Sequence, residues 1–564
     1  LSVVHEMSEK LFVLGLDGAT FDLINPWIKE GLLPNFARLM QTGTWGELRS
    51  TLHPLSPPAW TSFMTGKNPG KHGIYDFVVH KPNSYELLYT NGGMRKGATI
   101  WRLLSDAGKK VIVINVPMTY PPEEVNGINI SGFDAPGIDS NFVYPARVYK
   151  EIQNDLGEYI LRDYAKGHNP STFLKQIHAT LDFQKKLLFY MMERYEWDFY
   201  MMVFNALDLV QHGYWQYMDE SFTSISPEDR ALYGSAIKDM YIKIDGILGE
   251  LLVCLRRMPE ESDLLILSDH GAGRCRKAVF MNKWLESQGF LKYRERGKQI
   301  SILKFVHHGI KRVFSTSWLD WLKSAFPGLR QRVKSQLVFS EIDWRNTKAY
   351  CFGRESTNLF INLKGRYPMG TVNPGQEYEG LRNDLIDKLM NLRDPESGEM
   401  VVDKVFKSEE VYHGNCLDSA PDLLVTWKNG EYTSWPGYDD KDCSIFESAL
   451  DHSDFNEWSS LKKGGNHRPN GIFMMNGQEI NPNLELFGAE IIDLAPTILF
   501  MMGVPIPSDM DGKVLTSAFR PAYIHSKSPD FCEAGVSPAQ SPAFNYTGEQ
   551  ARQIEERLRN LGYI

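Results

Sequence analysis

Cysteine is scarce in this chain, with six among 564 residues and no C-x-x-C pair. A small secreted fold held by disulfide bonds needs a higher density, so we expect a reducing compartment and a cytoplasmic protein. No secretory signal precedes Met7, where we expect translation to start rather than at Leu1. Long apolar runs are missing too, because even residues 491–507 are interrupted by Asp493, Pro496 and Pro505. We therefore expect no membrane-spanning segment.

An excess of positive charge is also absent. The net charge is -9, which argues against binding of nucleic-acid polymers because a phosphate-backbone binder needs a basic surface. One stretch departs from this balance: residues 298–334 carry many Lys and Arg, interleaved with Trp318 and Trp321. Two interpretations stay open for it. It is either an arm that contacts an anionic substrate or an anionic membrane surface, or a solvated helical decoration of the core.

Short apolar runs alternate with helical stretches along most of the chain. This alternation predicts an α/β fold with a large, mostly parallel central sheet and helices on both faces. The clearest helix starts at Ser226, a capping residue followed by Pro227, and is expected to run to about Met258. In such sheets, ligands gather beyond the carboxyl ends of the strands.

The chain divides into a core and additions to it. We expect a catalytic core at residues 7–288 and 428–521, interrupted by an inserted cap at residues 289–427. Residues 522–564 are expected to form a Ser/Pro/Ala-rich linker and a short C-terminal helix.

Metal-ligand side chains follow several of the predicted strands. Asp269 and His270 directly follow the apolar run at 263–267, and Asp208 and His212 are spaced to share one face of a helical turn. Each of these features alone is also compatible with an ordinary turn or a surface histidine. Three acids and three histidines in four segments together indicate a two-metal site: Asp17, Asp208, His212, Asp269, His270 and His467.

Ser56 is the candidate nucleophile. Pro57 and Pro58 follow it and restrict the backbone, so Ser56 is expected on a rigid corner with an accessible hydroxyl. A plain rigid turn is the alternative interpretation of this tripeptide.

These segments, in this order, resemble the alkaline phosphatase superfamily and its type I phosphodiesterase/nucleotide pyrophosphatase-like branch. The similarity extends over most of the chain and is carried by six stretches, at residues 11–18, 34–39, 56–74, 268–271, 464–471 and 493–497. It implies an alkaline phosphatase-like fold with two divalent metal ions, zinc on family precedent, with manganese or magnesium as alternatives. One ion would be held by Asp17, Asp269 and His270 together with Ser56. The other would be held by Asp208, His212 and His467.

The resemblance implies that Ser56 attacks phosphorus and forms a phosphoseryl intermediate. Related nucleotide pyrophosphatases have an Asn three residues after the nucleophile, where this chain has Ala59. Another group must then stabilise the phosphoryl oxygen: backbone amides, the metals or a side chain such as Lys71. A sulfatase is disfavoured because the C/S-x-P-x-R pattern lacks its Arg here.

We therefore expect a metal-dependent phosphoesterase that acts on a small phosphate-ester substrate, a phosphodiester or a nucleotide pyrophosphate. The alternative is a phosphotransferase or hydrolase acting on lipid head-group or glycan phosphates, suggested by residues 298–334. A hypothesis of another class is a non-catalytic binding protein on the same fold.

Overall fold

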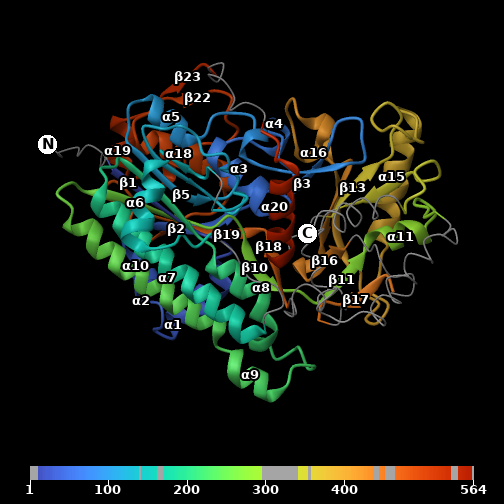
Figure 1. Ribbon diagram of the computed structural model, residues 1–564, viewed down its shortest axis with the longest axis horizontal. Helices are drawn as coiled ribbons and strands as arrows, with labels where there is room; N and C mark the ends of the chain where they lie inside the picture. The colour runs from blue at the N-terminus through green and yellow to red at the C-terminus, as the bar shows by residue number, and fades with distance from the viewer. Residues whose placement is uncertain are drawn as a thin grey trace.

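A long central sheet forms the larger of two lobes, seen at the left of Figure 1. The computed structural model describes residues 10–138, 141–161, 169–294, 341–352, 357–435, 444–450, 464–534 and 544–561. The basic segment 298–334 and Met7 lie outside these described residues. Within them, no helix has the length and apolar character needed to cross a membrane.

The central sheet is mostly parallel, as the sequence predicts. Strand β1 pairs in parallel with β8 and β9, and β5 pairs in parallel with β6 and β8. Strand β2 pairs in parallel with β20 and β21. Only β19 and β7 run antiparallel to their neighbours in the described part of this sheet. The strands, in order across the sheet, are β20 (Leu484–Glu485), β2 (Thr44–Arg49), β19 (Asn470–Asn476), β9 (Ser262–Leu267), β1 (Lys10–Leu16), β8 (Phe199–Phe204), β5 (Val111–Val116), β6 (Gly127–Ser131) and β7 (Val143–Tyr144), with β21 (Ala489–Glu490) also on β2.

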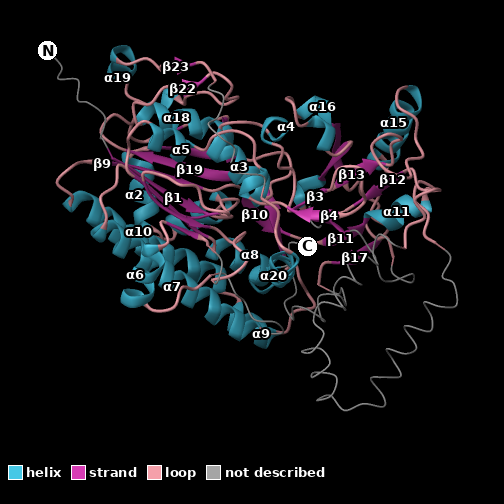
Figure 2. Ribbon diagram, turned by 45° about the horizontal axis from the view of Figure 1, so that its top comes forward, coloured by secondary structure: helices cyan, strands magenta, loops and turns pink. Residues whose placement is uncertain are grey.

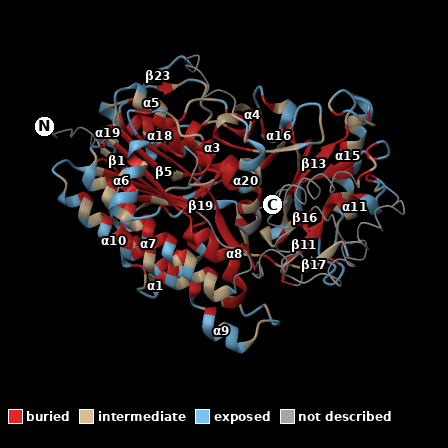
Figure 3. Ribbon diagram, viewed as in Figure 1, coloured by how far each residue is buried: buried red, intermediate tan, exposed pale blue. Residues whose placement is uncertain are grey.

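Both faces of this sheet are buried, because successive side chains of a strand point to opposite faces. In β1, Phe12 and Leu14 join one hydrophobic cluster while Leu11 and Val13 join the other. Figure 2 shows the strands between two helical layers, and Figure 3 shows the buried interior. The first cluster packs under α1 (Phe21–Lys29), α2 (Pro34–Thr42), α6 (Arg147–Leu156), α7 (Pro170–Arg194), α8 (Ala206–Met218) and α10 (Ala236–Arg257). The second packs under α3 (Ser56–Thr65), α5 (Ile100–Asp106) and α18 (Leu494–Met501).

The prediction of one helix from Ser226 to Met258 is wrong, because the structure has two helices there. Ser226 caps as predicted, with its side chain accepting from the Asp229 amide at 3.1 Å. The first helix, α9 (Pro227–Tyr233), stops before Ser235, and α10 continues from Ala236. Within α9, Arg230 donates to the main-chain carbonyls of Tyr217 and Asp219 at the end of α8. This docking directs α9 towards α8, which explains why one straight helix does not form.

The smaller lobe lies at the right of Figure 1 and has its own hydrophobic core. Its four-stranded sheet has the order β12 (Ala349–Cys351), β13 (Asn358–Ile361), β15 (Leu423–Trp427), β14 (Val402–Lys407). A three-stranded sheet adds β16 (Tyr432–Trp435), β11 (Lys277–Phe280) and β17 (Phe446–Ser448). Around them lie α11 (Met281–Ser287), α15 (Gln376–Met390), α16 (Ser408–Val411) and the hairpin of β3 (Val78–His80) and β4 (Leu87–Tyr89). The exact division at residues 289–427 stays a prediction.

The C-terminal residues return to the larger lobe. Tyr546 donates its hydroxyl to the Asp134 carbonyl at 2.6 Å, and Ile554 and Leu558 of the last helix join the first hydrophobic cluster. This part contains β22 (Ile506–Pro507), α19 (Pro521–Ser526), β23 (Phe531–Cys532) and α20 (Gly548–Leu561).

Candidate metal centre and active site

The carboxyl ends of three neighbouring parallel strands meet at one edge of the central sheet. Asp17 directly follows β1, Asp269 comes two residues after the end of β9, and Asp208 lies in the first turn of α8, which follows β8. Because β8, β1 and β9 are adjacent and parallel, their exits lie side by side. All three carboxylates are buried. The structure thus brings together acids that are up to 252 residues apart in the sequence.

One group of ligand atoms combines Asp208, His212 and His467. His212 lies one turn after Asp208 in α8, and its Nε2 is 3.1 Å from Asp208 Oδ1. His467 lies in β18 (Gly465–Arg468), which pairs with β10 (Gly271–Arg274), and its Nε2 is 2.8 Å from His212 Nε2 and 3.2 Å from Asp208 Oδ1. One carboxylate and two imidazoles thus converge as the sequence predicts, in an arrangement that can hold a cation.

A second group adjoins the first and combines Asp17, Asp208 and His270. His270 Nε2 lies 3.6 Å from Asp17 Oδ1 and 3.4 Å from Asp269 Oδ2, so Asp269 borders this group through His270. The rings of His270 and His467 stack with centroids 3.7 Å apart. Asp208 therefore belongs to both groups, a sharing that the sequence does not predict.

Hydrogen bonds fix the orientation of two imidazoles. His212 Nδ1 lies 3.1 Å from the Gly465 carbonyl, and His270 Nδ1 lies 3.0 Å from the Gly271 carbonyl. A carbonyl only accepts, so each Nδ1 carries the proton and each Nε2 presents its lone pair to the group. Metal-ligating histidines are commonly held in this way.

The protonation of the centre is set by burial and by the neighbouring ligands. Burial raises the pKa of Asp269 to about 7, and the Asp208 carboxylate adds to the effect. Burial also lowers the pKa of His270 to about 4, helped by His467. Burial alone would raise the pKa of Asp208, but His212 and His467 hold it well below its usual range.

Ser56 is the first residue of α3 and is fully buried. Its Oγ has no hydrogen-bond partner in the part of the chain that the structure describes. The expected rigid corner is instead a helix start, with Pro57 and Pro58 in its first turn. The preceding loop is fixed beside the strand of His467, since the Ser50 amide donates to the Pro469 carbonyl at 2.8 Å.

Comparison with known proteins identifies the family. The sequence profile of the type I phosphodiesterase / nucleotide pyrophosphatase family matches residues 11–442. The chain belongs to this family. It is accordingly a phosphoric ester hydrolase of the alkaline phosphatase superfamily, in a family that is metal-dependent. The hypothesis of a non-catalytic binding protein is not supported.

Solved structures give a more distant likeness. Human ectonucleotide pyrophosphatase / phosphodiesterase 5 aligns with a TM-score of 0.49 and 12% sequence identity, covering 90% of this chain and 98% of its own. The murine protein of the same name gives a TM-score of 0.49 and 12% identity, covering 91% of this chain and 100% of its own. An inactive form of the murine protein, in complex with AMP, aligns equally well. No curated protein sequence matches the chain.

The side chains at the sheet edge fit the divalent ions that the family requires. The imidazoles of His212 and His270 present Nε2 lone pairs. Both carboxylate oxygens of Asp269 are buried, and neither makes a hydrogen bond of standard geometry with any described residue. A buried carboxylate in this condition is costly unless a cation or a proton satisfies it. The mixed oxygen and nitrogen ligand set suits zinc, and it does not exclude manganese or magnesium.

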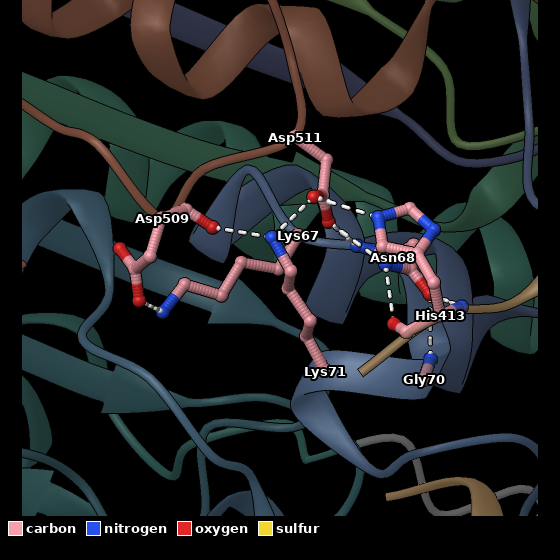
Figure 4. A network of polar contacts seen from close by, with 7 residues as sticks. All are labelled: Lys67, Asn68, Gly70, Lys71, His413, Asp509 and Asp511. Carbon is pink, nitrogen blue, oxygen red and sulfur yellow. Dashed lines mark hydrogen bonds and ion pairs between the residues drawn. The ribbon is translucent and has the colours of Figure 1, made fainter. Parts of the chain in front are cut away.

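Phosphoryl-oxygen stabilisation by Lys71 is not supported. Lys71 Nζ pairs with Asp511 and donates to the Asp509 carbonyl at 2.9 Å, while Lys67 pairs with the Asp509 carboxylate (Figure 4). The backbone of α3 offers little instead, because its two prolines have no N–H group and the Ala59 amide donates to the Leu55 carbonyl at 3.0 Å. The network of Figure 4 has a structural role: His413 of the smaller lobe also reaches Asp511, at 3.0 Å.

Two supporting residues were missed by the sequence analysis. Gln211 donates to the Gly18 carbonyl at 2.8 Å and so holds the loop of Asp17 against α8. Arg468 donates to the Gly430 carbonyl and to the Arg274 carbonyl, both at 2.6 Å, which ties the strand of His467 to the smaller lobe. Neither residue belongs to a local pattern, since their partners are distant in sequence. Only the adjacency of Arg468 to His467 could have drawn attention to it.

Proposed function

We propose that this protein hydrolyses phosphodiesters or nucleotide pyrophosphates with two divalent metal ions, zinc in the first instance, and with Ser56 as nucleophile. The observation that carries the proposal is the pair of buried ligand groups that share Asp208. Two divalent ions held by these adjoining groups would be suited to support in-line displacement at phosphorus.

Each side chain then has a defined task. Asp17, Asp269 and His270, with Ser56, would hold one ion, and Asp208, His212 and His467 would hold the other, with Asp208 also bordering the first. When bound, the ions supply Lewis-acid stabilisation of the attacking and leaving oxygens. Ser56 Oγ would attack phosphorus, its proton passing to the displaced group or to solvent, and that group leaves as an alcohol from a diester or as a phosphate from a pyrophosphate. Water then releases the remaining phosphate ester from Ser56.

The proposal is tested with the purified protein loaded with zinc, manganese or magnesium. Bis-p-nitrophenyl phosphate and a nucleotide pyrophosphate should be cleaved faster than p-nitrophenyl phosphate, and a sulfate ester should resist. Ser56→Ala should lower kcat by at least about 10³-fold, the loss expected for a covalent nucleophile. Its metal content, measured by elemental analysis, should stay near two ions per chain.

Rapid quenching during turnover, followed by peptide mass spectrometry, should show Ser56 carrying the phosphoryl group with its retained ester, p-nitrophenyl phosphate or a nucleotidyl group according to the substrate. Near-normal activity of Ser56→Ala would reject this nucleophile. A wild-type protein that binds no metal would reject the metal-dependent mechanism itself.

A further inference from the structure

Five buried polar atoms, one of them the Oγ of the nucleophile itself, lack hydrogen-bond partners in strict geometry among the described residues and lie in two segments that contact each other. The first segment is the nucleophile loop, residues 50–56, and the second is residues 357–358 of the smaller lobe, where β13 begins at Asn358. The atoms are Ser50 Oγ, His53 Nε2, Ser56 Oγ, Thr357 Oγ1 and Asn358 Oδ1. Buried polar atoms are normally satisfied, so a concentration of exceptions indicates a place where another polar molecule binds.

The two segments meet at His53 and Asn358. A hydrogen-bonding contact with the Asn358 side chain raises the pKa of His53 against the effect of burial, although His53 Nε2 and Asn358 Oδ1 fall outside strict hydrogen-bond geometry. His53 precedes Ser56 by three residues, which limits their Cα separation to about 10 Å. The Leu55 amide donates to the His53 carbonyl at 2.8 Å, and this turn brings His53 closer still. The smaller lobe thus reaches the immediate surroundings of the nucleophile.

Asp76 fixes the orientation of the Asn358 amide. Asn358 Nδ2 donates to Asp76 Oδ2 at 3.2 Å, and Asp76 Oδ1 accepts from the Phe77 amide at 2.6 Å. The nitrogen of the amide is therefore engaged, and its oxygen remains as an acceptor. Because Asp76 holds the amide from one side, Asn358 is preorganised before any ligand arrives.

The chemical character of these groups restricts what they bind. The hydroxyls of Ser50 and Thr357 and the imidazole of His53 can each donate and accept, and the amide oxygen of Asn358 accepts. None of these groups carries a positive charge. Burial lowers the pKa of His53 to about 4, opposed by Asn358, so its imidazole is neutral near pH 7. The nearby Asp76 carboxylate disfavours an anion. A hydroxyl group, which both donates and accepts, is the complement of this set.

We propose that the nucleophile loop and the start of β13 form a subsite for an uncharged, hydroxyl-bearing part of the phosphodiester, contacted by His53 and Asn358. The subsite would favour glycerol-like or sugar-like esters over plain alkyl esters. This inference rests on the proposed function, because Ser56 defines where the phosphorus lies. It also assigns the smaller lobe a role in substrate selection.

The test compares two diesters with the same leaving group: glyceryl p-nitrophenyl phosphate and propyl p-nitrophenyl phosphate. They differ only in the two hydroxyls. For the wild-type, metal-loaded protein, kcat/KM should be about tenfold higher for the glyceryl ester, the effect of one or two hydrogen bonds. A glucosyl ester in the same series distinguishes a sugar from a glycerol unit, and a carboxyethyl ester tests the exclusion of negative charge.

Asn358→Leu and His53→Phe should each reduce the glyceryl-to-propyl ratio towards one. The matched control is Asn391→Leu, an exposed residue of the same lobe, which should keep the wild-type ratio. Circular dichroism and metal content establish that each variant is folded and loaded. Should Asn358→Leu not fold, His53→Phe and the wild-type ratio still decide the question.

A wild-type ratio near one would overturn the subsite. A ratio that stays near ten in both variants would overturn the assignment of His53 and Asn358, and so would a wild-type preference for the carboxyethyl ester. If the wild-type protein cleaves none of these esters with any metal, the proposed function fails instead. The two failures are therefore distinguishable.

Discussion

The two lobes bury charge in opposite ways. In the smaller lobe, Asp422 is almost fully buried but is neutralised within the protein: Arg366 Nη1 donates to it at 3.0 Å and the Ile361 amide at 2.6 Å. At the edge of the central sheet, Asp269 is equally buried, yet its acidic neighbours Asp17 and Asp208 bring no positive charge and the adjacent His270 is neutral near pH 7.

This difference separates a structural charge from a functional one. A buried ion pair with satisfied hydrogen bonds is complete and needs nothing from solution. Closely spaced carboxylates and neutral imidazoles are incomplete, and a divalent cation supplies the missing positive charge. Buried carboxylates thus become informative about function only when the partners that neutralise them are examined.

The largest expected effect tests the structural half of the comparison. Asp422→Asn removes the negative charge and leaves Arg366 buried without its ion-pair partner. We expect the free energy of unfolding to fall by about 3 kcal/mol, as for other broken buried pairs. Urea unfolding followed by circular dichroism measures it. The metal content of Asp422→Asn should equal that of the wild-type protein. A loss of metal would show that metal binding at the central sheet depends on this ion pair of the smaller lobe.

A smaller effect of opposite sign is expected at the sheet edge. Asp269→Asn removes a carboxylate that repels Asp208, so the chelator-treated protein should become more stable by about 1 kcal/mol. The same change should weaken metal binding, because one oxygen ligand loses its charge. Unfolding is measured with and without chelator. Destabilisation of the metal-free protein would contradict the comparison, since Asp269 would then behave like Asp422.

A further effect, on metal affinity rather than on stability, concerns the connection between the lobes. Arg468→Lys keeps the charge but cannot bridge the Gly430 and Arg274 carbonyls. We expect about tenfold weaker zinc binding at the group containing His467, the usual consequence of losing an outer hydrogen bond. Competition with a chromophoric chelator measures the two zinc affinities. Arg276→Lys is the matched control, because its contact with Glu431 is 3.9 Å and partly exposed. If Arg468→Lys and Arg276→Lys bind zinc with the same affinity, Arg468 does not support the metal site.

Much of the candidate site could be read from local patterns. The run from Leu11 to Leu16 and the run before Asp269 are strands because both faces of a parallel sheet are buried. Their carboxyl ends had to meet if the sheet was parallel. The spacing of Asp208 and His212 requires one face of a helix, which α8 provides.

Other features had no local signal. The break between α9 and α10 follows from contacts of Arg230 with carbonyls beyond its own helix, and the start of α3 at Ser56 depends on how the loop docks beside Pro469. The role of Asn358 depends on a strand of the smaller lobe reaching Asp76 and His53.

The sequence by itself predicted the candidate ligands, because hydrophobic periodicity places Asp17 and Asp269 at strand ends and helical spacing puts Asp208 and His212 on one face. Only the tertiary structure decided which of them share a ligand position, as Asp208 does, and which residues support them. The physical reason is that periodicity is a property of neighbouring residues. Ligand sharing and hydrogen-bond satisfaction depend instead on distances between segments that are far apart in the chain.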